Sequence, residues 1–460
     1  MANIAFIQHR LGRTDGVSLE VDKFRQVLEE HGHTVHYLAG NEDVPGGCYI
    51  PELYPFHEVT QRILQNATRE LKDYPSPAAL LEEVREHADK IKPGMIRFLQ
   101  EKKIDLVFPN NLQSVGFNLP GMLALHEVLM ETGLPATCHN HDFWWEDSGE
   151  VYPTGPEVVA FYEEHAPPVA PHIHHLCINR LAQAELKKRR GVDARVVPNV
   201  FDFNRPSWTR DDYNADFREA IGLGPNDLFF LQATRILDRK GVELAIDTIA
   251  ALNRPENRRL LEGQPLYDGR RFGPENRIVL VCAGYVEGIG LRGNYPTLLS
   301  EKAAALGVEI IWCADRVKHS RGTTGDGEKI YSLWDSYVCA DFVTYPSVWE
   351  GWGNQLIEAV FAQLPVLLFE YPVYVSDLRE AGFAAVSLGE TVDGHDANGL
   401  VQVAPEKIDR AAAEVMRYLQ DGEMRRKAVE DNFARARERY SYEALAGHLR
   451  EILAAHGLQL

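Results

Sequence analysis

Two glutamates in the stretch PSVWEGWGNQLIEAVFAQLPVLLFEYP, residues 346–372, lie among residues that otherwise resemble a protein core. Glu350 falls in a turn that leads into a helix, and Glu358 lies two helical turns further on. A carboxylate can accept two hydrogen bonds from neighbouring hydroxyls of a sugar or a ribose. Glycines in the turn would let a ligand approach the backbone closely, and the positive end of the helix favours a phosphate. The stretch therefore predicts a site for a ligand that carries both hydroxyls and phosphate.

The alternative interpretation is a helix-dipole carboxylate followed by a solvated glutamate. It leaves unexplained why Glu358 lies in the apolar surroundings LIEAVFAQL, where an acid without partners is costly to bury.

A basic pair in QATRILDRKGVELA, residues 232–245, complements these acids. Arg235 is expected at the end of a strand, and Lys240 with Gly241 opens the next helix. Two cations and a glycine at a strand-to-helix turn suit a diphosphate. An Arg-Lys dipeptide at a helix start is common by itself, so the pair is informative only together with the glutamates.

Two histidines follow a predicted strand in ATCHNHDFWWEDS, residues 136–148. His139 and His141 are both placed to face a ligand at that strand end, and Asp142 comes directly after the second. One alternative is a surface loop with aromatic packing, and another is a metal site built from the two histidines and the carboxylate.

The elements that must position these residues alternate between strand and helix. Apolar runs such as NIAFIQH, IDLVFPN, LFFLQATR and RIVLVCAG are each followed by a segment that is apolar at helical spacing. This alternation predicts an α/β protein with parallel sheets covered by helices on both faces. The polar, proline-containing segment 201–228 breaks the pattern. We therefore predict doubly wound domains at 1–205 and 206–435, a helix at 436–460 that returns to the first domain, and a cleft between the halves.

Composition restricts the class of protein. The chain has 460 residues, 45% of them apolar and 25% charged, and a formal net charge of -19. This charge argues against nucleic acid or an anionic membrane as a partner. Six cysteines without a C-x-x-C pair, no visible secretory signal and no apolar run of the ~20 residues needed to cross a bilayer predict a cytoplasmic location.

These motifs together resemble the retaining glycosyltransferases of family 4, which have the GT-B fold. The resemblance covers nearly the whole chain and includes the linker strand VVPNVFDF. It implies that Arg235 and Lys240 hold the diphosphate of a nucleotide-sugar donor, Glu358 the ribose, and Glu350 the transferred sugar. It also implies donor contacts from the helix start, at Gly351, Gly353, Asn354 and Gln355. A histidine of this family faces the donor sugar near the anomeric carbon; here it is His139 or His141, and we favour His141 because Asp142 follows it.

The sequence WEGWGNQLIEA is most similar to the branch of this family that builds small glycerate-containing solutes. That implies GDP-mannose as the donor, with UDP-glucose as the alternative, and an acceptor such as glucosylglycerate.

The chain has no Asp-x-Asp motif, so we predict that no cofactor is required and that no metal binds the diphosphate, although a divalent ion is a possible alternative. The family's reaction is taken as front-face attack, in which the leaving phosphate accepts the proton of the acceptor.

Two turns of the first half correspond to the acceptor side of the family. The first is QHRLGRTDGVSLEV, where an anionic acceptor such as a glycerate carboxylate could be held by Arg10, Arg13 and Thr14. The second is FPNNLQSVGFN, where acceptor hydroxyls could be bound by Asn110, Asn111 and Gln113, with Asp142 nearby. A solvated turn is the alternative for each. The insertion 315–329 lies beside the expected nucleotide, and we interpret it as a solvated loop.

Three other functions remain as alternatives. Gly288, Gly290 and Gly293 imitate a dinucleotide fingerprint, which would indicate an NAD(P)-dependent oxidoreductase, but Pro296 follows where its long helix should run. A sugar phosphorylase on the same fold and a non-catalytic sugar-binding protein are the others. A homo-oligomer is possible.

Overall fold

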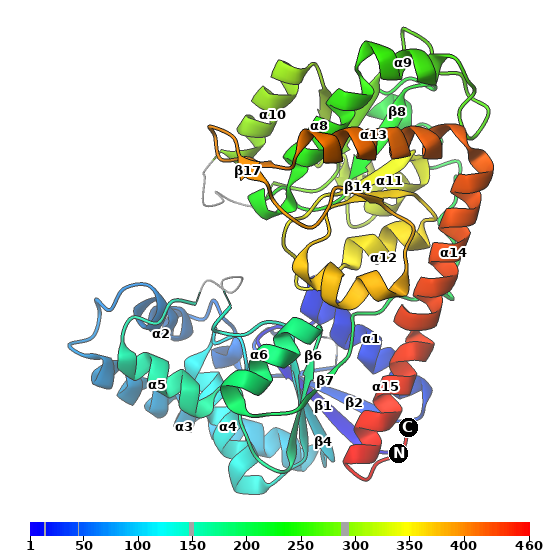
Figure 1. Cartoon of the computed structure of the whole chain (residues 1–460). Helices are drawn as coiled ribbons and strands as arrows, with labels where there is room; N and C mark the ends of the chain where they lie inside the picture. Colours follow the sequence, from blue (N-terminus) through cyan, green and yellow to red (C-terminus); the bar gives the residue numbers. More distant parts are fainter. Residues whose placement is uncertain (13–14, 45, 147–150, 287–293) are drawn as a thin grey trace. The chain divides into compact units, whose positions relative to one another are not determined.

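The computed structural model describes residues 1–12, 15–44, 46–146, 151–286 and 294–460. The chain forms two compact units (Figure 1). The first unit contains residues 1–200 and 440–460, and the second contains residues 201–439. The sequence-based division placed the corresponding limits at residues 205 and 436. The predicted α/β class with parallel main sheets is confirmed.

The first unit contains a seven-stranded parallel sheet with the order β3-β2-β1-β4-β5-β6-β7. Its strands are β1 (Asn3–Gln8), β2 (Thr34–Ala39), β3 (Cys48–Tyr49), β4 (Leu106–Pro109), β5 (Ala136–Asn140), β6 (Ile173–Cys177) and β7 (Ala194–Val196). Every residue of β4 and of β5 is buried. Burial of both faces is typical of a parallel sheet between two helical layers.

The helices of this unit are α1 (Gly16–Glu30), α2 (Glu58–Thr68), α3 (Pro77–Glu101), α4 (Leu119–Thr132), α5 (Pro156–His165), α6 (Arg180–Arg190) and α15 (Tyr442–Ala455), with a short 3-10 turn η1 (Pro51–Leu53). Local sequence explains where several begin. The Asp15 side chain accepts the Ser18 N–H at the start of α1, and the Asn118 side chain accepts the Gly121 N–H at the start of α4. Such side-chain caps satisfy N–H groups that the helix itself leaves open.

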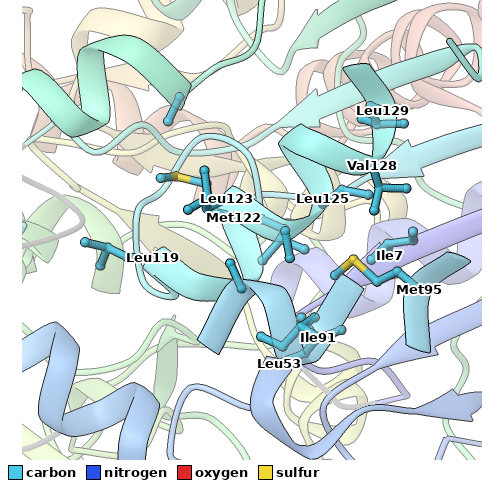
Figure 2. Close-up of a cluster of buried hydrophobic side chains, with 14 of the residues drawn as sticks. Ile7, Leu53, Ile91, Met95, Leu119, Met122, Leu123, Leu125, Val128 and Leu129 are labelled. Carbon is cyan, nitrogen blue, oxygen red and sulfur yellow. The ribbon is translucent and has the colours of Figure 1, made fainter. Parts of the chain in front are cut away.

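Hydrophobic residues cover both faces of this sheet. On one face, α3 and α4 pack against β1 and η1, as the cluster around Ile91, Met95 and Met122 shows (Figure 2). On the other face, Leu445 and Leu449 of α15 belong to the same buried cluster as residues of α1 and β1. The last helix of the chain therefore completes the core of the first unit, although more than 200 residues separate it from β7.

The second unit contains a six-stranded parallel sheet with the order β10-β9-β8-β14-β15-β16. Its strands are β8 (Leu228–Gln232), β9 (Ile278–Cys282), β10 (Glu309–Trp312), β14 (Phe342–Tyr345), β15 (Val366–Leu368) and β16 (Val386–Ser387). A small sheet contains β11 (Val317–Lys318), β12 (Gly322–Thr323) and β13 (Lys329–Ser332), and a two-stranded sheet contains β17 (Gly394–His395) and β18 (Val401–Gln402).

The helices of the second unit are α7 (Phe217–Ala220), α8 (Val242–Leu252), α9 (Pro255–Glu262), α10 (Tyr295–Leu306), α11 (Leu333–Cys339), α12 (Asn354–Phe361), α13 (Pro405–Gln420) and α14 (Gly422–Tyr440). Short helical turns are η3 (Asp238–Lys240), η4 (Tyr374–Leu378) and η5 (Arg379–Ala381). Within the described ranges, every helix is too short or too polar to span a lipid bilayer.

The segment 315–329, interpreted from sequence as a solvated loop, contributes β11, β12 and the start of β13. Arg321 donates to Asp335 over 3.0 Å and to Asp211 over 2.8 Å. The Lys318 ammonium donates to the carbonyl oxygen of Ala314 over 2.8 Å. The segment is thus an ordered part of the second unit, and its cations bind groups of the protein itself.

Each main sheet has one switch point, the place where its strand order reverses direction. In the first unit it lies between β1 and β4, and in the second between β8 and β14. Crossovers on the two sides of such a point run in opposite directions and leave a crevice at the carboxyl ends of the strands, where α/β proteins usually bind their ligands. Most of the predicted site residues follow these strands, while His139, His141 and Asp142 lie at the end of β5, the neighbour of β4.

Candidate active site

The switch point of the second unit brings Lys240 of the predicted basic pair to Glu350, and the charge of Arg235 acts on Lys240. Arg235 and Lys240 follow β8, and Glu350 follows β14, its direct neighbour. The backbone N–H of Val348 donates to the carbonyl oxygen of Arg239 over 2.9 Å and joins the two loops. Groups about 110 residues apart in sequence therefore share one small site.

Gly241 makes this close approach possible. Its φ is +57°, in the left-handed region, and a Cβ atom there would lie 2.4 Å from the carbonyl oxygen of Pro346. A side chain would meet both a backbone penalty and a collision with main chain. The loop after β8 consequently rests directly on the loop after β14.

The Glu350 carboxylate binds two cations. Lys240 Nζ donates to Oε1, and Arg239 Nη1 donates to Oε2 over 3.0 Å. The side chain of Glu350 is 12% exposed and that of Lys240 is 8% exposed. Burial by itself would raise the pKa of Glu350, but the charges of Lys240 and Arg239 outweigh it and hold that pKa below its ordinary value. Glu350 is therefore a carboxylate at neutral pH.

The same neighbours act on Lys240 in both directions. Burial lowers the pKa of Lys240, the Glu350 carboxylate acts to raise it, and the charges of Arg239 and Arg235 lower it again. Two cations thus bind Glu350, and the charge of Arg235 also acts on Lys240, so that positive charge gathers at this switch point. Such a concentration of positive charge suits an anionic ligand even in a chain whose net charge is -19.

Arg239 was not identified from the sequence. It stands directly before Lys240, and the motif contains it, but no spacing rule separates a cation that binds the ligand from one that binds a neighbouring acid. Only its contact with Glu350, 111 positions away in the chain, reveals its place in the site.

Glu358 is the fifth residue of α12 and is half-buried. The hydroxyl of Tyr337, from α11, donates to its Oε2 over 3.0 Å. Tyr337 is 1% exposed, so its hydroxyl is fixed by the core. The prediction that Glu358 cannot lie in an apolar environment without partners agrees with this contact, and Tyr337 is a second residue that the motif did not reveal.

Gly353, in the turn before α12, has close neighbours that leave no room for a side chain. A Cβ atom on Gly353 would lie 2.8 Å from the hydroxyl oxygen of Tyr371 and 2.8 Å from a methyl carbon of Leu378. Packing within the unit therefore requires glycine here, besides the predicted approach of a ligand. The other predicted donor contacts of this turn are half-buried Gly351, exposed Asn354 and buried Gln355.

The two histidines lie at the end of β5, the strand next to β4 and beside the switch point of the first unit. Their ring centroids lie 4.1 Å apart, and the ring of Phe24 lies 4.8 Å from that of His139. His139 is 1% exposed and His141 is 7% exposed. Neither ring nitrogen of His139 has a hydrogen-bond partner among the residues that the structure describes. His139 therefore packs as part of the core, whereas His141 lies past the end of β5, in the loop.

Burial lowers the pKa of both histidines, and that of His141 falls to about 3. For His141, the nearby Asp15 opposes this effect and Lys23 adds to it. Both imidazoles are thus neutral at physiological pH and can exchange hydrogen bonds with a ligand without carrying charge.

Asn111 positions the loop that carries His141. Its φ is +56°, which is uncommon for a residue other than glycine. Its side-chain oxygen accepts the N–H groups of His141 (2.7 Å) and Asp142 (3.1 Å), and its amide nitrogen donates to the Asp142 carboxylate over 2.9 Å. The predicted acceptor contact of Asn111 is replaced by contacts within the protein.

Asn110 and Gln113 also require a correction. Both are completely buried, and their amide nitrogens donate to the carbonyl oxygens of Phe108 and Met122. We therefore no longer assign acceptor hydroxyls to these two side chains, because they hold the loop after β4 to the strand and to α4.

Arg10 keeps an accessible position near the start of α1. Its side chain is 39% exposed, and its Nε lies 3.3 Å from the Asp15 carboxylate. Arg13 and Thr14, the other two predicted anion contacts, lie outside the described residues, as do Gly288, Gly290 and Gly293 of the dinucleotide-like motif.

No protein-family profile matches the chain, but two proteins match it over nearly their whole length. Mannosylglucosylglycerate synthase of Thermotoga maritima is 36% identical over 453 residues, which cover 98% of this chain and 99% of the relative. The protein of the same name from Petrotoga mobilis is 34% identical over 421 residues, which cover 91% and 93%. The chain belongs to the mannosylglucosylglycerate synthase family.

Solved structures agree with the fold of this family member. Sucrose-phosphate synthase from Thermosynechococcus elongatus matches with a TM-score of 0.57 at 15% identity, covering 99% of this chain and 100% of the other. The catalytic domain of starch synthase IV from Arabidopsis thaliana, bound to ADP and acarbose, matches with a TM-score of 0.55 at 11% identity and covers 99% of each chain. WaaG, a glycosyltransferase of lipopolysaccharide biosynthesis, gives 0.53 at 15% identity, with 97% and 99% covered.

These neighbours share the fold only, and they confirm the predicted GT-B class. Together with the mannosylglucosylglycerate synthase relatives, they make the chain a glycosyltransferase. Within the described part of the chain, no group of three or more His, Cys, Asp or Glu side chains is arranged to hold a metal ion.

Replacing Gly241 with alanine in this mannosylglucosylglycerate synthase family member should disrupt the candidate site around Glu350. The left-handed backbone alone costs about 1–2 kcal/mol, and the collision with Pro346 pushes the two loops apart. We expect a lower melting temperature and loss of the melting-temperature rise on nucleotide addition. Gly322→Ala is the control, because a Cβ atom there meets nothing within 4 Å. Equal behaviour of the two variants would contradict the role of Gly241.

The pH dependence of activity should show no ionisation of a histidine. The pKa of His141 is lowered to about 3 by burial, so this imidazole stays neutral between pH 5.5 and 8. We expect kcat between pH 5.5 and 8 to show no ionisation near 6.5, the ordinary histidine value. An inflection near 6.5 that disappears in a His141 variant would contradict this expectation.

Proposed function

We propose that the protein transfers a mannosyl group from GDP-mannose to glucosylglycerate, with retention of the anomeric configuration. The observation that carries the proposal is 36% identity along 98% of the chain to a protein named mannosylglucosylglycerate synthase. That name describes a product in which mannose is joined to glucosylglycerate. The charged groups at the two switch points fit the two substrates.

The donor lies on the second unit in this proposal. Arg235 and Lys240 bind the diphosphate, with no metal required, because the excess positive charge around Glu350 already offsets phosphate charge. The Glu350 carboxylate accepts hydrogen bonds from hydroxyls of the transferred sugar. Glu358, held by Tyr337, accepts those of the ribose. The turn 351–355 supplies backbone N–H groups for phosphate oxygens.

The acceptor lies on the first unit. Arg10, together with the predicted contacts Arg13 and Thr14, binds the glycerate carboxylate, and Asp142 binds acceptor hydroxyls. His141 contributes a neutral hydrogen-bonding group beside the donor sugar. The position of His141 depends on Asn111, which binds its backbone N–H.

The reaction then needs no protein nucleophile. The bond between the anomeric carbon and the phosphate oxygen breaks, and the acceptor oxygen forms its bond on the same face of the sugar. The acceptor proton passes to the leaving phosphate oxygen. The protein contributes positioning of the two substrates and stabilisation of negative charge on the diphosphate by its cations. We place this reaction in the cytoplasm, in keeping with six free cysteines.

The proposal is tested by thermal unfolding with GDP, UDP or ADP, each alone and with glycerate or glucosylglycerate. A nucleotide present at a hundredfold excess over its Kd stabilises the folded state by about 2.7 kcal/mol, or roughly 5–10 °C for a unit of this size. We expect this rise with GDP and a much smaller one with UDP and ADP.

Incubation with GDP-mannose and glucosylglycerate should then yield a product with the anomeric configuration of the donor by NMR. A rise with UDP and consumption of UDP-glucose would instead indicate a glucosyltransferase. Release of phosphate from a sugar phosphate without any nucleotide would indicate a phosphorylase. Either result would overturn the proposal.

A further inference from the structure

Arg239 is fixed against the loop that carries Glu350. Its Nη1 donates to Glu350 Oε2 over 3.0 Å and to the carbonyl oxygen of Trp349 over 3.1 Å. Its guanidinium carbon lies 5.5 Å from the centre of the Trp349 ring. Its own carbonyl oxygen accepts the Val348 N–H over 2.9 Å. Main chain, ring and carboxylate therefore all hold Arg239 on this loop.

The two cations bind different oxygens of the same carboxylate. Lys240 donates to Oε1 and Arg239 to Oε2, so either contact can weaken while the other persists. Lys240 is the more enclosed of the two, with 8% of its side chain exposed against 30% for Arg239.

A conflict follows from the proposed function. Lys240 is assigned to the donor diphosphate, yet in this structure its ammonium group binds Glu350. When Lys240 binds the diphosphate, the Glu350 carboxylate loses part or all of the positive charge that offsets its burial, since its side chain is only 12% exposed. A buried carboxylate without a cation takes up a proton and becomes a poorer acceptor for sugar hydroxyls.

We propose that Arg239 is a positioning residue for Glu350: it keeps this carboxylate ionised and oriented while Lys240 binds the donor diphosphate. The inference rests on the proposed function, because it presupposes that Lys240 serves a diphosphate. Arginine suits the task, since its planar guanidinium stays charged and binds a carboxylate, a carbonyl and an aromatic face at once.

The groups that face Glu350 define what the loss of Arg239 would do. They are Lys240 and Arg239 from η3, with Arg235 acting on Lys240, and Tyr345 from the end of β14. Burial raises the pKa of Tyr345 well above its ordinary value, and Glu350 adds to the rise, so this phenol stays neutral. Removal of Arg239 therefore leaves Lys240 as the one direct cation partner described for Glu350, and the pKa of Glu350 rises.

The first test compares Arg239→Gln and Arg239→Lys with wild type. Because Glu350 would protonate at a higher pH, we expect the acid limb of the kcat–pH profile of Arg239→Gln to move to higher pH. At pH 7 its kcat should fall at least tenfold, while KM for GDP-mannose should change less than threefold. Arg239→Lys restores the charge and should return the acid limb to its wild-type position. An unchanged limb and kcat in Arg239→Gln would overturn the inference.

Arg258 supplies a matched control in the same unit. Its side chain is 22% exposed, its Nε lies 3.5 Å from the Glu262 carboxylate, and its guanidinium carbon lies 4.9 Å from the Phe272 ring centre. Its guanidinium also donates to the carbonyl oxygen of Asn276 over 2.9 Å, so Arg258→Gln removes an ion pair, a ring contact and a main-chain contact, as Arg239→Gln does. It should leave the kcat–pH profile unchanged, and a shift equal to that of Arg239→Gln would show that the effect is not specific to Glu350.

A second readout needs neither donor nor transfer. The folded pKa of Glu350 lies below its unfolded value, so its ionisation stabilises the fold at neutral pH, and this contribution is lost as pH falls through the folded pKa. Arg239→Gln should therefore lower the melting temperature at pH 7 by more than at pH 4. In a Glu350→Gln background that difference should vanish. If wild type transfers no mannose but this coupling persists, the proposed function fails and the Arg239–Glu350 link stands; absence of the coupling overturns the link itself.

Discussion

Lys240→Ala abolishes the melting-temperature rise that GDP produces and lowers kcat/KM for GDP-mannose by roughly 30- to 700-fold, which corresponds to about 2–4 kcal/mol of transition-state stabilisation. The reason lies in its surroundings. Lys240 follows β8 at the switch point, its side chain is 8% exposed, and it is one of the two cations that bind Glu350. A diphosphate bound there loses a charge that Arg235 cannot replace, because Arg235 occupies its own place at the strand end.

A second lysine, half-buried in the same unit, makes this prediction specific. Lys302 of α10 donates to Asp247 of α8 over 2.8 Å, and its side chain is 13% exposed. Lys302→Ala removes a comparable ion pair between two helices of the same unit. We expect it to lower the melting temperature without ligand and yet to keep the full GDP-induced rise. A full GDP-induced rise in Lys240→Ala would show that the diphosphate binds elsewhere.

His141→Leu lowers kcat by about 100-fold or more, as expected when a group that hydrogen-bonds the reacting part of a substrate is lost. His139→Leu, the same change two positions earlier, should retain most of the activity. Neither ring nitrogen of His139 has a partner among the described residues, and its ring packs against Phe24. An apolar side chain of similar volume therefore replaces it at a cost below about 1.5 kcal/mol.

The comparison of these two variants measures which histidine serves the reaction. Single-turnover rates with saturating GDP-mannose report the chemical step, and thermal unfolding reports any loss of packing. If His139→Leu lost more activity than His141→Leu at equal stability, the assignment would have to be reversed.

Much of the fold could be predicted because parallel strands are buried on both faces. The run IVLVC forms β9 with every residue buried, and LFFLQ forms β8 in the same way. The start of α4 has a local cause, because the Asn118 side chain accepts the Gly121 N–H. The short strands of the insertion 315–329 were not predicted, because they are stabilised by pairing with one another and by the contact of Arg321 with Asp335 rather than by their own apolar content.

The proximity of Lys240 to Glu350 could be predicted for a related reason. Loops after parallel strands meet at one edge of a sheet, so charged residues at strand ends are informative even without coordinates. The direction of an individual side chain is not. Asn110 and Gln113 also follow a strand, but their amides bind main-chain carbonyls inside the protein, and no local pattern distinguishes that orientation from one toward a ligand.

The sequence by itself determined the class of fold, the strand ends at which charge gathers and the resemblance to a glycosyltransferase family, because these depend on local periodicity and on residues close in the chain. Only the tertiary structure decided that Arg239 and Lys240 share Glu350, that Tyr337 holds Glu358, and that Asn111 serves His141 rather than an acceptor. Such contacts join residues 21 to 111 positions apart. Their geometry follows from strand order and from how closely two loops can approach, as at Gly241.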